Sequence, residues 1–258
     1  MRLTFHTHAT IDAPARLVLA GGRGRLALAV RFGVLERDGH APVLIDGGWP
    51  ARRDGEVAAL RLYRAALRPK VDSAAAPVAV LGGRPEAVLL SHLHADHMGA
   101  LSELPGVPVH APRAAWAAAR RHPWRALRHG VVGELLPRAV ASDVAGDVAG
   151  DTALPHALGR GGDPLGDGSV LSVPLAGHAD GHTGFLFPAF DPPILYAADV
   201  QWVWAAVRDR RPPRGPARAV YADGAAAMDS LERVRRFAAA GGRVVLCHDP
   251  APVPVFAA

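Results

Sequence analysis

Apolar residues in the first half of the chain form short runs that turns interrupt. Residues 26–35 and 41–45 predict two strands joined by a turn at Arg37-Asp38-Gly39. Residues 86–90 and 107–110 predict two further short strands. This half of the chain therefore supplies several strands of one sheet.

Two helices are predicted among these strands. Asp54 is placed to cap a helix that ends near Leu67. Pro112 is placed to begin an amphipathic helix that reaches about His129, because proline fits the first helical position.

Strands recur in the second half of the chain. Residues 170–174, 184–187 and 194–198 predict three of them, and a helix over residues 225–240 leads into the apolar strand 243–247. Strands that gather in both halves with helices between them predict an α/β fold, in which two sheets pack together under helices.

Residues 139–167 differ from the rest of the chain. They contain a small repeat of Asp-Val-Ala-Gly and little apolar periodicity, so we expect a flexible loop there. No linker is strong enough to divide the chain, and residues 1–258 are therefore expected to form a single domain.

The charge and the apolar content exclude some classes of protein. The net charge of +5 favours binding to nucleic acid, but Lys70 is the only lysine and the other positive charges are arginines. Most codons for Arg, like those for Ala, Gly and Pro, are rich in G and C, so codon bias explains the composition at least as well. Nucleic acid is therefore not expected as a partner. No apolar stretch is long enough for a membrane helix, and residues 1–19 do not resemble a secretory signal. We expect a soluble, cytoplasmic protein, in which the single cysteine, Cys247, packs in an apolar strand.

The segment with the clearest chemistry is Ser91-His92-Leu93-His94-Ala95-Asp96-His97-Met98-Gly99, directly after a predicted strand. Its four ligand-type side chains lie within six residues, so His92 and His94 can face one ion while Asp96 and His97 face another. Imidazole and carboxylate groups suit a cation such as Zn²⁺. Three more candidates, His178, Asp199 and His248, each follow an apolar strand.

The order His-x-His-x-Asp-His, Gly-His, strand-end Asp and strand-end His resembles the metallo-β-lactamase superfamily. That resemblance extends over about residues 26–250 and implies a four-layer αββα sandwich that holds two metal ions. It assigns His92, His94 and His178 to the first ion, Asp96, His97 and His248 to the second, and Asp199 as a bridge. It also implies that Asp46 supports the ligand loop from behind, and that His182 is structural rather than a ligand.

Within the superfamily, the length and the histidine loop are most similar to the N-acyl homoserine lactonase-like branch. Lactonases of that branch carry a tyrosine three residues after the bridging aspartate, whereas this chain has Trp202 there. An indole has no phenolic proton to donate. We therefore expect Trp202 to contribute to substrate binding in an apolar pocket, or else to pack in the core.

The expected reaction is hydrolysis of a small ester, lactone or related substrate by a hydroxide that bridges two metal ions. The ions are expected to be Zn²⁺, with Fe or Mn as alternatives, and Asp96 is a candidate catalytic residue that carries a proton to the leaving group. The partner is a small-molecule substrate, and an apolar, tryptophan-bearing surface is compatible with a homodimer.

Three alternatives stay open at this point: a metal-dependent phosphodiesterase or nuclease, an iron-dependent oxygenase on the same fold, and a non-catalytic binding protein. A nuclease would use the positive charge of the first predicted amphipathic helix after the histidine loop. That charge comes from Arg113, Arg120, Arg121, Arg125 and Arg128, interleaved with Trp116 and Trp124.

Overall fold

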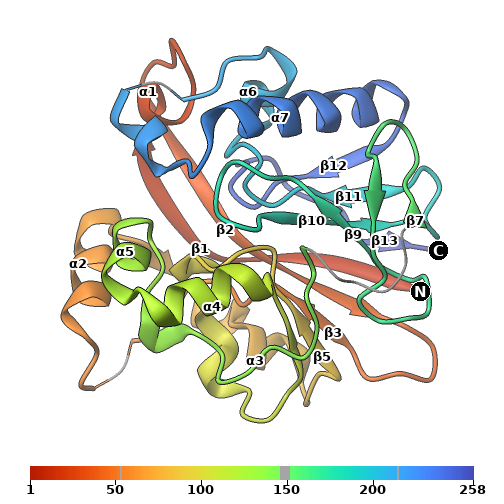
Figure 1. Ribbon diagram of the computed structural model, residues 1–258, viewed down its shortest axis with the longest axis horizontal. Coiled ribbons are helices and arrows are strands. Elements are labelled where there is room, and N and C mark those ends of the chain that lie inside the picture. The colour runs from red at the N-terminus through yellow and green to blue at the C-terminus, as the bar shows by residue number, and fades with distance from the viewer. Residues whose placement is uncertain (53, 146–151, 214) are drawn as a thin grey trace.

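Two β-sheets pack face to face, and helices cover the outer face of each (Figure 1). The computed structural model describes residues 1–52, 54–145, 152–213 and 215–258. Short strands such as β3 (Val43–Ile45) and β5 (Ala87–Leu89) are apolar at every position because both of their faces are covered. The predicted four-layer αββα arrangement is confirmed.

The first sheet has the strand order β13-β1-β2-β3-β5-β6, and β4 pairs with β1. Its pairs are antiparallel from β13 to β3, whereas β3, β5 and β6 run parallel. Besides β3 and β5, its strands are β1 (Arg2–Pro14), β2 (Arg25–Glu36), β4 (Lys70–Val71), β6 (Val109–His110) and β13 (Phe256–Ala257).

The second sheet has the order β12-β11-β10-β9. Strands β9 and β11 are both antiparallel to β10, and β12 is parallel to β11. The carboxyl ends of β9, β11 and β12 therefore lie at the same edge. The bounds are β9 (Leu171–Pro174), β10 (Thr183–Phe187), β11 (Ile194–Tyr196) and β12 (Arg243–Val245).

Apolar side chains fill three layers. One cluster lies between the sheets and includes Leu89 and Phe185, a second includes Val88 and packs under α2 to α5, and a third includes Phe237 of α7. In Figure 1, α6 and α7 cover the second sheet, and α2 to α5 lie on the opposite side of the molecule. The helices are α1 (Ala15–Val18), α2 (Ala58–Leu67), α3 (Pro77–Leu81), α4 (Arg113–Arg121), α5 (Pro123–Arg128), α6 (Trp204–Arg208) and α7 (Gly224–Ala239). None of the described helices is long and apolar enough to cross a membrane.

The first strand of the sheet was not predicted. Strand β1 spans 13 residues and pairs with β2 along its whole length, although the sequence analysis placed no element before residue 26. Its buried apolar positions alternate with polar side chains, and the register shifts between Thr7 and Ala9. This irregularity interrupts the period of two that would have marked a strand.

One predicted helix beginning in the first half was wrong, and the other predicted helix begins at Arg113, directly after Pro112, but is divided in two. Asp54 does not cap a helix, because α2 begins at Ala58 after Val57 and has no side-chain cap. The helix expected from Pro112 to His129 is two helices, α4 and α5, which meet at His122. Pro123 begins α5, since a proline has no N–H to continue the hydrogen bonds of α4.

The segment predicted as a flexible loop, residues 139–167, contains ordered structure where it is described. Strands β7 (Thr152–Ala153) and β8 (Arg160–Gly161) form a small antiparallel sheet, and Val144 and Leu158 are buried. Residues 146–151, which hold most of the repeat, lie outside the described residues. The flexibility of the segment stays a prediction.

Glycine is required at position 177, where the loop after β9 meets α7. Gly177 has a φ of +125°, and a Cβ there would lie 2.1 Å from the backbone nitrogen of Ala227. Gly168 has a φ of +73° but open space around it. We expect Gly177→Ala to lower the free energy of unfolding by at least about 3 kcal/mol, and Gly168→Ala by about 1 kcal/mol.

Chemical denaturation of the two variants measures this difference. Equal losses of stability would show that the contact with α7 is not a constraint, and that only backbone strain counts.

Candidate metal centre

The predicted ligands follow β5, β9, β11 and β12 and meet at one edge of the two sheets. Four of them lie on the loop after β5, which turns as a short 3-10 helix at Ala95–His97 and so points neighbouring side chains in different directions. All the predicted ligands are buried: His92, His94, Asp96, His97, His178, Asp199 and His248. The structure therefore brings together residues that are more than 150 positions apart in the chain.

Three histidines form a first cluster. The Nδ1 atom of His94 lies 3.0 Å from Nε2 of His92 and 3.1 Å from Nε2 of His178. Two nitrogen ligands of one tetrahedral zinc ion are about 3.4 Å apart. The three nitrogens are thus close to the separation that a single ion requires, and the groups fit a metal.

A second cluster contains His97, Asp199, Cys247 and His248, whose ligand atoms all lie within 4.8 Å of one another. Nε2 of His97 and Oδ1 of Asp199 are 3.4 Å apart. Neither atom has a hydrogen-bond partner among the described residues, although both are buried. Buried polar atoms are rarely left without a partner, and a cation between them would satisfy both.

Asp199 lies between the two clusters. Its Oδ2 atom is 3.4 Å from Nε2 of His178 in the first cluster and 3.0 Å from Nε2 of His248 in the second. A carboxylate with two oxygen atoms can bind two ions at once. Its position is the one that the predicted bridge requires.

Asp96 has a less central position than the sequence predicts. Its Oδ2 atom is 3.6 Å from Nε2 of His248, and its Oδ1 atom accepts a hydrogen bond of 3.1 Å from the Tyr63 hydroxyl. The Tyr63 ring stacks on Trp49, with centroids 5.3 Å apart. Sequence analysis missed Tyr63, because nothing in the pattern of α2 separates it from a packing residue.

Asp46 lies next to the ligand loop and is fully buried. Its carboxylate accepts hydrogen bonds from the backbone N–H and the hydroxyl of Ser91, from Tyr196 and from Nδ1 of His97, all between 2.8 and 2.9 Å. Because Nδ1 of His97 donates to Asp46, the lone pair on Nε2 of His97 is left to face the other groups of the second cluster.

Burial favours neutral imidazoles in the first cluster. Burial lowers the pKa of His94 to about 4, and lowers the pKa of His92 and His178 well below the ordinary value. Neutral imidazole is the form that binds a metal. In the second cluster, Asp199 raises the pKa of His248 and Asp46 raises that of His97, despite the opposing effect of burial.

His182 has both ring nitrogens engaged. Nδ1 donates to the carbonyl oxygen of Leu175 at 2.8 Å, and Nε2 accepts from the backbone N–H of Asp199 at 3.1 Å. The ring therefore holds the Asp199 backbone in place and has no lone pair left for a metal.

Cys247 was expected to pack in an apolar strand. It is buried, but its Sγ atom belongs to the second cluster. Burial alone would raise the pKa of its thiol, yet His248 and His97 bring that pKa below the ordinary value. Only its place directly before His248 could have indicated this in the sequence.

Trp202 is half-buried beside the first cluster. Its ring centroid is 6.4 Å from that of His178, and the ring also packs against a cluster that includes Val203 and Trp49. The Tyr221 ring lies on the same histidine, with centroids 5.8 Å apart, and its hydroxyl donates to Oε1 of Gln201. The role of Trp202 in substrate binding stays a prediction.

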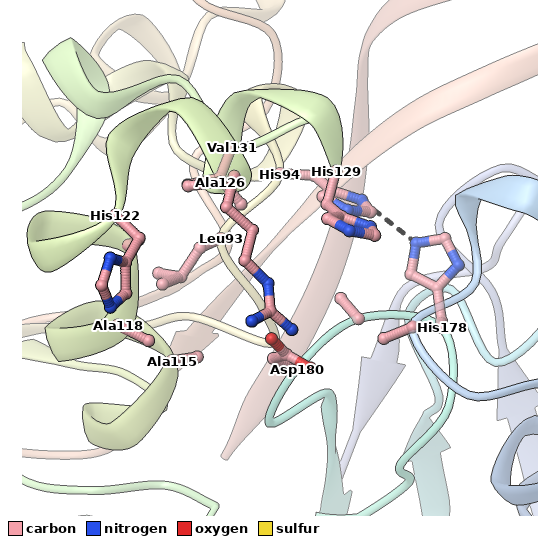
Figure 2. Close-up of a pocket in the computed structure, with 14 residues that line it drawn as sticks. Leu93, His94, Ala115, Ala118, His122, Ala126, His129, Val131, His178 and Asp180 are labelled. Carbon is pink, nitrogen blue, oxygen red and sulfur yellow. Dashed lines mark hydrogen bonds between the residues drawn. The ribbon is translucent and has the colours of Figure 1, made fainter.

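A cavity of about 210 Å³ opens beside the first cluster. His94 and His178 face one another at one end of it, and His122 lies at the other (Figure 2). Its wall is mostly apolar, with Leu93, Val131 and the alanines 115, 118, 119 and 126. The polar groups at the cavity include Arg125, His129 and Asp180.

The buried carboxylate of Asp46 gives a test of the centre. Asp46→Asn keeps the shape of the side chain but removes the charge that holds Nδ1–H of His97, so we expect metal affinity to fall about 10- to 100-fold. Competition with a coloured chelator measures this. The matched control is Asp12→Asn, at an exposed aspartate paired with Arg25, which should leave affinity unchanged. Equal affinities for both variants would contradict the supporting role of Asp46.

The sequence matches the family described as Metallo-beta-lactamase superfamily over residues 27–245. A search of curated proteins finds no match. Among solved structures, an N-acyl homoserine lactone hydrolase with the product N-hexanoyl-L-homoserine at its catalytic metal centre gives a TM-score of 0.69, at 18% identity, over 96% of this chain and 93% of that chain.

Two further structures have the same fold. A single-residue mutant of AiiA from B. thuringiensis, with N-decanoyl-L-homoserine at its active site, gives a TM-score of 0.68 at 18% identity, over 96% of this chain and 93% of that chain. AidC, a dizinc quorum-quenching lactonase, gives 0.60 at 15% identity, over 97% and 88%. The predicted resemblance and the predicted class of metallo-hydrolase are confirmed: the chain belongs to the metallo-beta-lactamase superfamily.

Proposed function

We propose that this chain is a dinuclear metal-dependent hydrolase that acts on a small ester or lactone. The observation that carries the proposal is the position of Asp199, whose two carboxylate oxygens face the histidines of both clusters. The first ion would be held by His92, His94 and His178. The second would be held by Asp96, His97 and His248, with Asp199 between the two.

Zn²⁺ suits this donor set best, because imidazole nitrogens outnumber carboxylate oxygens, and Fe or Mn are the alternatives. When bound, two such ions supply a nucleophilic water with a lowered pKa and polarise the carbonyl oxygen under attack. Burial of the surrounding side chains keeps other water out and strengthens the electrostatic interactions inside the site.

The chain's own residues position the reacting groups. Asp96 lies at the edge of the second cluster, with Oδ1 held by the Tyr63 hydroxyl, so its other oxygen faces His248 and the site. That carboxylate is placed to carry a proton to the leaving oxygen. No hydroxyl comes from position 202, which supports a role for Trp202 in substrate binding rather than in bond cleavage.

The cavity supports a substrate with an apolar chain. Small alanine side chains leave space along one wall, and the cavity opens directly on His94 and His178. The related structures hold N-acyl homoserine products or analogues with hexanoyl or decanoyl chains. An acylated lactone or ester is therefore the substrate class that we propose. Location in the cytoplasm and assembly as a homodimer stay predictions.

A nuclease has weaker support. The guanidinium of Arg120 lies over the ring of Trp116 on the same helix, 5.2 Å from its centroid. This arginine and this tryptophan therefore already form a cation–π contact with each other. Trp124, with 81% of its surface exposed, is left as the one aromatic of α5 that a base could stack on.

A substrate panel tests the proposed function. Protein loaded with Zn²⁺ is given acylated lactones, aryl esters, a thioester and a phosphodiester, and acid release is followed with an indicator. We expect turnover of lactones or esters, lost on chelation and lowered at least about a hundredfold in His94→Ala. The control is His40→Ala, a change at an exposed histidine, which should leave turnover unchanged. Hydrolysis of the phosphodiester alone would overturn the proposal.

Substitution of Trp202 separates substrate binding from chemistry. We expect Trp202→Ala to raise KM several-fold more than it lowers kcat, because the indole contributes binding in the ground state. Stability should also fall, by roughly 2 kcal/mol, since the ring is half-buried.

Trp204→Ala is the matched control. Trp204 is also half-buried and lines a second cavity, with Arg243 and Val244, whereas the ring of Trp202 lies beside His178. It should lose stability without a change in KM. If kcat falls in Trp202→Ala while metal content is kept, the indole acts in the transition state instead.

A further inference from the structure

The sulfur atom of Cys247 lies at the second cluster of the metal centre. Strand β12 ends at Val245, and Cys247 follows two residues later, immediately before His248. Its Sγ atom is within 4.8 Å of the ligand atoms of His97, Asp199 and His248. The side chain is fully buried, and it is the only cysteine of the chain.

Two buried atoms without partners point to a ligand at the same place. Nε2 of His97 and Oδ1 of Asp199 have no hydrogen-bond partner within the part of the chain that the structure describes. Nδ1 of His248 donates to the carbonyl oxygen of Ala29 at 2.6 Å, which leaves its Nε2 facing Asp199. A nitrogen of each histidine, an oxygen and the sulfur therefore lie close together, and each is a metal donor.

The backbone around the sulfur is fixed by Arg31. The buried guanidinium donates to the carbonyl oxygens of Leu246 and Cys247, at 3.0 and 3.3 Å. The backbone N–H of Arg31 donates to Sγ at 3.4 Å, and the thiol donates to the backbone carbonyl oxygen of Arg31 at 3.6 Å. The N–H donor would still stabilise the sulfur once a metal replaced the thiol proton, and the rigid backbone keeps the sulfur beside the histidines.

We propose that Cys247 is a further ligand of the second metal ion, beside Asp96, His97, His248 and Asp199. The proposal rests on the proposed function only in requiring that this ion is bound. As the metal–sulfur bond forms, the thiol loses its proton to solvent, and the thiolate electron pair makes the bond.

This assignment changes what the second site accepts and what Asp96 does. A thiolate ligand favours zinc, iron or cobalt over manganese and magnesium, which prefer oxygen. It also relieves Asp96 of the need to hold the ion closely. Asp96 is the predicted ligand whose carboxylate is additionally held by a tyrosine, Tyr63, and a loosely bound carboxylate is better placed to carry a proton.

Cobalt spectroscopy tests the proposal. The apoprotein is titrated with two equivalents of Co²⁺ under anaerobic conditions, and the absorption spectrum is recorded. A thiolate bound to Co²⁺ gives a strong charge-transfer band in the near ultraviolet, whereas nitrogen and oxygen ligands give only weak visible bands. Because the chain has a single cysteine, such a band in the unmodified protein assigns Cys247.

Two variants identify the ligand and the cluster that give the charge-transfer band. Cys247→Ser should lose it while the weak visible bands remain, and should bind the second cobalt ion at least about tenfold more weakly. His94→Ala, in the first cluster, should keep the band. Circular dichroism shows whether each variant is folded. If Cys247→Ser does not fold, the absorption spectrum of the cobalt-loaded unmodified protein still tests the proposal.

The result separates this proposal from the proposed function. If two cobalt ions bind and esters are hydrolysed without a charge-transfer band, Cys247 is not a ligand, and the proposal is overturned while the hydrolase stands. If the band appears but no ester or lactone is turned over, Cys247 is a ligand and the proposed substrate class is wrong.

Discussion

A single buried carboxylate, Asp46, connects the two sheets to the metal centre. It follows β3 in the first sheet, accepts a hydrogen bond from Tyr196 of the second, and holds Ser91 and His97 of the ligand loop. A buried charge is costly unless it is paired and hydrogen-bonded, so its four donors must all be in place when the chain folds. The position of the ligand loop is therefore set by the packing of the sandwich. Asp46 itself adopts a φ of 58°, which is rare outside glycine and directs its backbone into the turn after β3.

The same burial sets the chemistry of the site. In the first cluster, burial holds the histidines neutral, as the lowered pKa of His94 indicates. In the second cluster, the outer nitrogens are engaged by neighbouring groups: Nδ1 of His97 donates to Asp46, and Nδ1 of His248 donates to the carbonyl oxygen of Ala29. The inner nitrogens are thereby left to face a common point. His97 and His248 are thus positioned by hydrogen bonds that do not involve a metal, so a cation would cause little reorganisation of these two side chains if it binds there.

Much of this architecture could be predicted from the sequence, because the strongest signals are local. The apolar runs gave most of the sandwich strands, and the spacing from His92 to His97 gave the ligand loop. The failures have physical causes. Strand β1 has polar residues on alternate positions and a register shift, and the break at Pro123 depends on a single missing N–H. Tyr63 reaches the site only through tertiary packing, since it contacts Asp96 from α2 and no local pattern in the sequence encodes that contact.

The hydroxyl groups near the metal centre come from tyrosines and not from position 202, which is a tryptophan. The chain has no hydroxyl three residues after Asp199, yet two tyrosines reach the neighbourhood of the clusters from α2 and from the segment before α7. The Tyr63 hydroxyl is already committed to Asp96, and that of Tyr221 to Gln201. Both hydroxyls therefore act first on the protein's own side chains. Burial raises the pKa of the Tyr221 hydroxyl above its ordinary value, so the hydroxyl stays protonated and a hydrogen-bond donor near neutral pH. In the proposed function, polarisation of a substrate carbonyl would consequently fall to the metal ions, next to a cavity whose wall is mostly apolar.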